Sequence, residues 1–462
     1  MIFALYNGME IVMFKLKRVG KHVKQLGMTA FFVFMLWPGL IQAEQSSKFM
    51  MGNETFAYAA ANENNQGQSF ETRLFVSTDL AYENNHITGE LQGEGWLIYP
   101  IENSVWGHIS NANVGYQYRG KADYFFKVGR VLPEWGSFNR YSPIQKLFPQ
   151  FYVDPFETKT DGWVGGYAHI QENLVDLEVM LSPIFIPSFG GPTYDYRGDG
   201  SFYSPSRWAL PFYYQATIAE APVPLKYTLH YPEDIMDILF RPSGAVRLSL
   251  RDFFDGYKIS ALVMHGPDPM PRLRIQSRLD IIQEKSFEGD IHLFPEFYNQ
   301  TAYGFEFRAK RHGFDLYFES VYRVPENQED MEEYMVKSQE WNHVFAIQTK
   351  HDHPYWPQTL LGISSTYQFD PYKDPYFKLP APSLHNFLSR LEWKINPQVD
   401  VYQSAEWSVN LDQAIFRNGL NLSILPKFQV SGGLDVIMGT NATYFGYFRQ
   451  HDRLWLKGTY AF

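Results

Sequence analysis

The last ten residues of the chain, 453–462, alternate between two kinds of side chain and end on an aromatic ring. One face of an extended strand would carry Leu454, Leu456, Gly458, Tyr460 and Phe462, and the other Arg453, Trp455, Lys457, Thr459 and Ala461. A strand that crosses a bilayer within a barrel has this pattern, because alternate residues face lipid and lumen over about ten positions. The segment therefore predicts a transmembrane β-strand.

The same period-two alternation recurs along the chain, at 175–181, 246–251, 272–281, 303–310, 315–323 and 387–395. Half-buried strands of a soluble sandwich alternate too, so no single segment decides the fold. The number of such segments and an aromatic content of 17% favour a membrane barrel, whose rings form girdles at both interfaces. We predict an all-β fold, a single transmembrane antiparallel β-barrel of about 18 strands, within a range of roughly 16 to 22.

Turn signals and long irregular stretches predict the topology. Short turns are expected at 241–244, 311–313, 396–398 and 426–427, and long loops at 133–162, 185–206, 324–339 and 370–383. Barrels of this class combine short periplasmic turns with long extracellular loops. Counting back from a periplasmic C-terminus, with 440–451 outside, places the turns at 396–398 and 425–427 in the periplasm. The same count places 324–339 and 370–383 outside.

The N-terminal region predicts a leader. Five basic residues, Lys15, Lys17, Arg18, Lys21 and Lys24, precede an apolar run over 28–40, and the small residue Ala43 suits the position before a cleavage site. We expect a signal peptide over 1–43, a flexible lead-in over 44–68 that is rich in Asn, Gln and Ser, and the barrel over 69–462. A retained N-terminal anchor is the alternative, and Met13 is a possible true start.

The terminal strand resembles the C-terminal signal that the outer-membrane assembly machinery recognises in bacterial barrel proteins. Tyr460 and Phe462 would carry that signal. The resemblance implies the outer membrane of a Gram-negative bacterium, with its lipid, its lipopolysaccharide and the barrel-assembly machinery as partners.

The chain has an acidic net charge, whereas its predicted lumen faces carry mainly basic residues. Without residues 1–43 the formal net charge is −14, compared with −10 for all 462 residues, so a basic nucleic-acid surface is excluded. The predicted lumen faces are nonetheless rich in basic residues: Arg247, Arg251, Arg272, Arg274, Arg278, Arg308, Lys310, Arg390 and Lys394. Basic rings attract anions in pores, which predicts an anion pathway. The alternative is that these residues pair with carboxylates on neighbouring strands and stiffen the wall.

Aromatic residues near the long loops suggest a second solute class. Trp135, Trp163, Trp208 and Trp356 could stack on sugar rings, or they could anchor the barrel at the membrane interface. The sequence contains no cysteine, no Gly-x-Ser-x-Gly, no His-Glu-x-x-His and no phosphate-binding glycine loop. We therefore expect no catalytic residues, no metal, no cofactor and no enzyme activity.

Two local motifs resemble outer-membrane channels of the alginate-export and porin-like type. One is Val128-Gly129-Arg130-Val131-Leu132-Pro133-Glu134-Trp135-Gly136, and the other is Tyr444-Phe445-Gly446-Tyr447-Phe448-Arg449-Gln450-His451-Asp452-Arg453. The resemblance covers about thirty residues and implies a monomeric barrel with a folded-in loop and a basic lumen.

The sequence thus predicts a channel for passive, selective passage of polar solutes, anionic or saccharide. One alternative is an exporter of an acidic polysaccharide that works with periplasmic partners. The other is a non-conducting barrel that serves as a surface enzyme or scaffold.

Overall fold

The computed structural model describes residues 44–462 except 61–68, 85, 100–104, 137, 139–140, 153, 191–194, 198–200, 205, 210–214, 219–220, 231–234, 253, 255, 271, 284–285, 312, 327–338, 350–354, 370–384, 410–411, 441–442 and 444. The predicted signal peptide, 1–43, lies outside this part of the chain, as does the 61–68 portion of the predicted lead-in.

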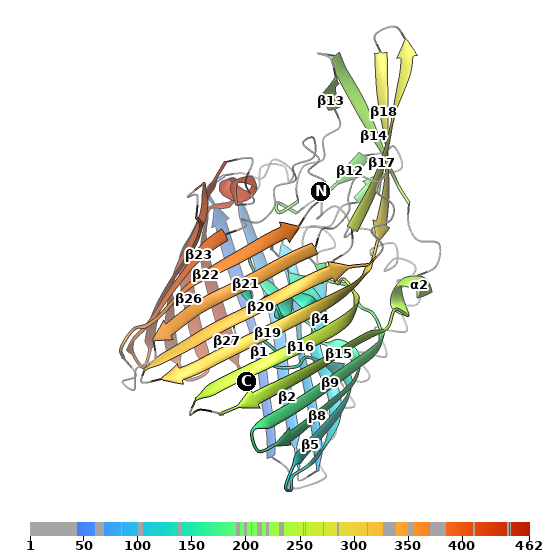
Figure 1. Ribbon diagram of the computed structural model, residues 1–462. Coiled ribbons are helices and arrows are strands. Elements are labelled where there is room, and N and C mark those ends of the chain that lie inside the picture. Colours follow the sequence, from blue (N-terminus) through green and yellow to red (C-terminus); the bar gives the residue numbers. More distant parts are fainter. Residues whose placement is uncertain are drawn as a thin grey trace.

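Eighteen antiparallel strands form one closed sheet, which confirms the predicted barrel (Figure 1). They are β1 (Glu44–Tyr58), β2 (Phe70–Glu83), β3 (Ile87–Tyr99), β4 (Val105–Tyr118), β5 (Asp123–Val131), β8 (Trp163–Glu172), β9 (Val175–Ile184), β15 (Ser243–Arg251), β16 (Tyr257–Pro267), β19 (Asn299–Arg311), β20 (Phe314–Pro325), β21 (Gln339–Thr349), β22 (Gln358–Phe369), β23 (His385–Asn396), β24 (Val399–Ser408), β25 (Gln413–Leu425), β26 (Phe428–Gly439) and β27 (Arg453–Ala461). Each strand pairs with its neighbours in the chain order of this set.

The barrel closes through its first strand. β1 pairs with β2 on one side and with β27 on the other, where Met50 lies opposite Ala461 and Tyr58 lies opposite Arg453. The prediction of a flexible lead-in was therefore wrong for 44–58, which form a full wall strand. Polar residues misled the prediction, because Glu54 and its neighbours on that face line a lumen in which polar side chains are paired rather than solvated.

The two ends of the barrel differ in the length of their connections, as predicted. One end has short links such as 173–174, 397–398 and 426–427, whereas the other has long ones such as 132–162, 185–242, 268–298 and 440–452. The C-terminus ends at the side of the short links, which is the periplasmic side in this class. Residues 241–244 differ from the prediction, because they end the outer loop 185–242 and enter β15.

The outer surface of the wall is apolar. Along β9, Leu177 and Leu181 are exposed on the outside, whereas Glu178 and Met180 between them are buried on the inside. The outward residues of β27 are likewise exposed, with Leu454 at 61%. A closed barrel satisfies all of its backbone hydrogen bonds internally, and an apolar exterior matches the hydrocarbon of a bilayer. The protein is therefore a multi-pass outer-membrane β-barrel.

None of the helices in the described residues is long and apolar enough to cross a membrane. The helical elements are short: α2 (Met236–Leu239) and the 3-10 turns η4 (Gln145–Leu147) and η5 (Gly446–His451).

A separate sheet projects beyond the outer end of the barrel (Figure 1). It consists of β13 (Gln215–Ile218), β14 (Ala221–Leu229), β17 (Arg272–Gln283) and β18 (Ser286–Glu296), from the loops 185–242 and 268–298. The prediction that Arg272, Arg274 and Arg278 line the lumen was therefore wrong. β17 alternates as a wall strand does, because a sheet half-buried against another element has the same period of two.

Two further small sheets lie in the outer loops. β6 (Gln150–Tyr152) pairs with β7 (Thr158–Thr160) and, in parallel, with β10 (Phe189–Gly190). β11 (Asp195–Arg197) pairs with β12 (Ser201–Tyr203).

Candidate functional site

The lumen is narrowed by residues 132–162, which we call the inserted segment. It begins where β5 ends, at a distortion that glycine permits: Gly129 has φ 131° and Gly136 has φ 81°. A side chain at Gly129 would meet the Ala112 carbonyl oxygen at 2.3 Å. The two glycines therefore let the chain leave the wall and turn inward.

An apolar contact holds the first half of the inserted segment against one side of the wall. Trp135, Ile144, Leu147 and Phe148 are all at most 1% exposed. They pack with inward-facing residues of several strands, namely Val131, Trp163, Met180, Ala245, Leu262, Met264, Ala302 and Val321. Small side chains at 245 and 302 leave room for the tryptophan, so this part of the lumen is a packed core rather than an open channel.

Polar contacts fix the same half. Trp135 Nε1 donates to Glu178 Oε2 at 2.5 Å, and Ser142 Oγ donates to Glu319 Oε2 at 2.5 Å. Glu178 also accepts from Arg247 Nη1 at 2.9 Å, and Arg247 reaches Glu306 as well. A buried charge is tolerated when it is paired and hydrogen-bonded, and this chain of contacts crosses from β9 through β15 to β19.

The second half of the inserted segment contacts the opposite side of the wall. Asp154 is fully buried and lies between Arg453, whose Nη1 is 3.0 Å away, and Arg73, whose Nη2 is 3.4 Å away. Arg453 also donates to Asp435 at 2.8 Å, and Arg73 to Glu71 at 2.6 Å. Burial alone would raise the pKa of Asp154, but Arg453, Arg73 and Arg417 hold it well below its usual range.

Asp161 anchors the end of the inserted segment. It accepts from His108 Nδ1 at 2.9 Å and from Arg130 Nη2 at 2.8 Å. The His108 ring also stacks on Phe151, with centroids 4.4 Å apart. The inserted segment is thus fixed to both sides of the lumen and at both of its ends.

A second group packs at the outer end of the barrel beside β1 and β25–β27. We call Tyr58, Phe156, Trp208, Phe448 and His451 the mouth cluster. Trp208 is 2% exposed and stacks on His451 at 4.5 Å. His451 Nε2 donates to the carbonyl of residue 207 at 2.6 Å, and burial lowers the pKa of His451 to about 4.

Most of the arginines predicted to line the lumen do so, but in ion pairs. Arg247 pairs with two glutamates, Arg251 with Asp176 at 2.7 Å, and Arg308 with Asp315 at 3.1 Å. Arg390 pairs with Glu392 on its own strand and keeps an exposed side chain. These contacts match the alternative in which basic residues stiffen the wall.

Lys310 and Lys394 differ from those arginines. Both share the inward-facing register of their strands, both are exposed, and neither has an ion pair with another described residue. They lie near the periplasmic ends of β19 and β23, in the part of the lumen below the inserted segment.

The tryptophans predicted as a possible sugar track are mostly structural. Trp135, Trp163 and Trp208 are buried in the contacts described above, at 7% exposure or less. Trp356 is exposed at the periplasmic end. The prediction of a stacking track was therefore wrong for three of the four residues, because each packs a loop against the wall.

Sequence reasoning missed the residues that hold the inserted segment, above all Asp154, Asp161, Arg73 and His108. Nothing in their local sequence marks them, since each acts through a partner far along the chain. The two motifs that carried the family resemblance do contain other residues that hold the inserted segment and the mouth cluster. Arg130 and Trp135 belong to the first motif, and His451 and Arg453 to the second.

No protein-family model and no curated protein matches this chain. Among solved structures it is similar to a BenF-like porin from Pseudomonas fluorescens Pf-5, with 8% identity, a TM-score of 0.48, and coverage of 91% of this chain and 98% of that one. It is also similar to OccK11 (OpdR) from Pseudomonas aeruginosa, with 9% identity, a TM-score of 0.46 and coverage of 90% and 95%. A third is OpdQ from the same species, with 10% identity, a TM-score of 0.45 and coverage of 90% and 98%.

The eighteen-strand barrel, its apolar exterior and its charged interior are those of an outer-membrane β-barrel with a polar lumen.

Proposed function

We propose that the protein passes polar solutes passively and favours anionic ones. The observation that carries the anion preference is the pair of exposed, inward-facing lysines, Lys310 and Lys394, below the inserted segment. A cation without a partner in a narrow aqueous passage lowers the free energy of an entering anion, whereas a paired arginine does so far less.

The inserted segment would set the size limit. It contacts β9 through Trp135 and β27 through Asp154, so a solute must pass beside it rather than through the centre of the barrel. A small carboxylate or phosphate suits such a passage. A saccharide has less support, because the tryptophans that suggested it are mostly buried.

Single-channel recording in planar bilayers tests this proposal. Under a salt gradient, the reversal potential should show that anions are more permeant than cations. The double variant Lys310→Gln/Lys394→Gln should lower the anion-to-cation permeability ratio by about twofold or more, since two unit charges leave the passage.

Lys121→Gln is the matched control. It removes the same charge from the exposed periplasmic turn between β4 and β5, outside the lumen, and should leave the ratio unchanged. Cation selectivity in the wild type would overturn the anion preference. A protein without conductance in any salt would overturn passage altogether and favour a scaffold.

Export of an acidic polysaccharide is the second candidate, and it is favoured by the location of the two resembling motifs at the anchors of the inserted segment. A polymer needs a wider passage than a small anion does. Block of the current by oligomeric uronates from the periplasmic side, but not by the monomer, would favour export.

A further inference from the structure

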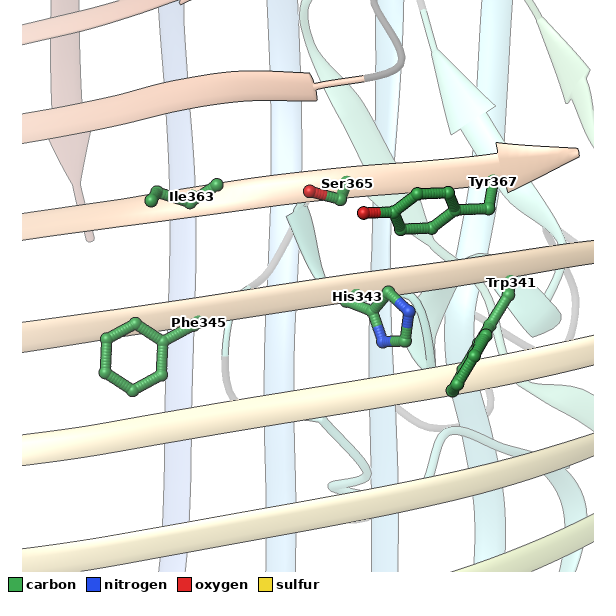
Figure 2. Close-up of a pocket in the computed structure, with 6 residues that line it drawn as sticks. All are labelled: Trp341, His343, Phe345, Ile363, Ser365 and Tyr367. Atoms are coloured by element: carbon green, nitrogen blue, oxygen red, sulfur yellow. The ribbon is translucent and has the colours of Figure 1, made fainter. Parts of the chain in front are cut away.

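A pocket of about 590 Å³ opens on the membrane-facing side of the wall, between β21 and β22 (Figure 2). Its lining consists of three cross-strand pairs: Trp341 with Tyr367, His343 with Ser365, and Phe345 with Ile363. The intervening Val344 and Ala346 are completely buried on the inner face. The six lining residues therefore face the bilayer and not the lumen.

The height of the pocket places it in the outer leaflet. β21 starts at Gln339, directly after the outer loop that follows β20, and Trp341 is its third residue. Trp341 and Tyr367 are 43% and 49% exposed, as expected for rings at the level of the headgroups. Phe345 and Ile363 lie deeper along the strands, at the level of the acyl chains.

Two of the six lining side chains are polar, which is unusual for a lipid-facing wall. His343 and Ser365 lie side by side in the middle of the pocket (Figure 2). His343 Nδ1 is enclosed and has no hydrogen-bond partner among the described residues. An unpaired acceptor costs less than an unpaired donor, so the proton belongs on Nε2, which is left to donate to an occupant.

We propose that this pocket binds lipopolysaccharide of the outer leaflet. An ester carbonyl or phosphate oxygen of the lipid would accept hydrogen bonds from His343 and Ser365, while an acyl chain lies along Phe345 and Ile363. Trp341 keeps its position by donating to Ser320 Oγ at 2.9 Å, so the rim is fixed before the lipid arrives. This inference is independent of the solute that passes through the lumen.

A lipid is favoured over a second copy of the barrel by the shape and chemistry of the site. The surface is hollowed between β21 and β22, and its two polar side chains form the middle cross-strand pair of the lining, where a thin chain with an oxygen-bearing head can reach them. The convex outer wall of another barrel would cover the rim and leave the His343 donor unpaired.

Because the chain has no cysteine, a single introduced cysteine is a unique attachment point. We would label Ile363→Cys with a benzophenone and reconstitute it in vesicles of lipopolysaccharide and phosphatidylethanolamine. Val263→Cys on β16 is the matched control, since it faces outward, is similarly exposed and lies near the outer end of its strand.

Photolysis should give about fivefold more lipopolysaccharide adduct at 363 than at 263, the factor expected for one net hydrogen bond. His343→Phe should reduce the adduct at 363 to the control level, and Ser365→Trp, which fills the pocket, should do the same. Heat-modifiable electrophoresis and conductance would show that both variants are folded. Equal lipopolysaccharide labelling at both positions, a phosphatidylethanolamine excess at 363, or mainly protein dimers at 363 would each overturn the proposal.

Discussion

Oδ2 of Asp154 accepts a 3.0 Å hydrogen bond from Nη1 of Arg453, a residue 299 positions further along the chain. The same oxygen is within 3.4 Å of both terminal nitrogens of Arg73. Arg73 and Arg453 belong to β2 and β27, the two strands that pair with β1. One carboxylate of the inserted segment therefore bridges the strands on either side of the closing strand.

Removal of Arg453 should destabilise this bridge strongly. Arg453 pairs with Asp154, Asp435 and Glu157, so Arg453→Ala leaves these three carboxylates without their main cation. The loss should be about 3–5 kcal/mol, as for a broken buried pair. We expect the folded band in heat-modifiable electrophoresis to be lost at a lower temperature than in the wild type. The single-channel conductance should become larger and noisier, because the inserted segment is held less firmly. Arg119→Ala is the control, because its ion pair with Glu83 is exposed and worth about 0–1 kcal/mol. If Arg453→Ala and Arg119→Ala lost the folded band at the same temperature, the stabilising role of the Asp154–Arg453 contact would be contradicted.

Arg247 should matter for stability and not for selectivity. Arg247→Ala removes the cation that is hydrogen-bonded to the buried carboxylates of Glu178 and Glu306, so thermal stability should fall by a similar amount, about 3–5 kcal/mol. Arg247→Met, with a Glu178→Gln and Glu306→Gln background, should recover most of the loss. A change in reversal potential without a change in melting would show that Arg247 serves the solute instead.

The arginines of the projecting sheet should not influence the current. We expect Arg272→Ala, Arg274→Ala and Arg278→Ala together to leave conductance and reversal potential unchanged at 1 M salt, where the screening length is about 3 Å. Lys394→Ala in the same recordings serves as the positive control. A loss of anion selectivity in the triple variant would place β17 at the solute pathway.

Acid should weaken the mouth cluster through His451. Its pKa of about 4 lies below the ordinary 6.5, so between these values the unfolded chain binds a proton that the folded protein excludes. Stability contributed by the neutral ring is present above pH 6.5 and falls as the pH drops towards 4, by at most about 3 kcal/mol. Melting at pH 7 and pH 4.5 should therefore differ more in the wild type than in His451→Gln. A histidine resonance that is lost in His451→Gln but titrates near 6.5 would contradict this.

Assembly should depend on the last ring. Phe462 is 57% exposed on the outer face and contacts Tyr460 at 4.9 Å and Phe49 at 5.3 Å. Phe462→Ala should lower the fraction of heat-modifiable barrel in outer-membrane preparations, while Phe126→Ala, which removes another outward-facing ring (47% exposed) on β5, should not. Refolding of purified Phe462→Ala into detergent should remain efficient, which separates recognition by the assembly machinery from stability.

Alternation was sufficient to predict the wall, because the period of two directly reflects which side chains face lipid. It predicted the faces of β19 and β27 and the turns at 396–398 and 425–427 on the periplasmic side. The outer loop predicted at 370–383 lies outside the described residues. It could not distinguish β17 from a wall strand, since the segment around Arg278 has the same local pattern in a different environment. The prediction of a flexible lead-in failed for a related reason. β1 is a strand because it pairs with β2 and β27, which contain Arg73 and Arg453, and its own residues do not show this.

The site was less predictable than the wall. Whether Arg247 attracts a solute or neutralises Glu178 depends on the register of β9 against β15, which a single strand does not reveal. The contact of Asp154 depends on a loop that folds back into the lumen. The one local signal for that loop was the motif from Val128 to Gly136, whose resemblance to other barrels implied a folded-in loop.

Closure through β1 has a consequence for the order of events in biogenesis. Glu54 and Lys457, which meet across the seam, are 403 positions apart, so this pairing cannot form until almost the whole polypeptide has been delivered. Until then, β1 presents a row of unpaired amide and carbonyl groups along one side, which is a template for pairing with a foreign strand. The strand that completes the cylinder is thus also its most vulnerable edge during transit, and a chaperone in the periplasm would have to shield residues 50–58 for longer than any other part of the wall.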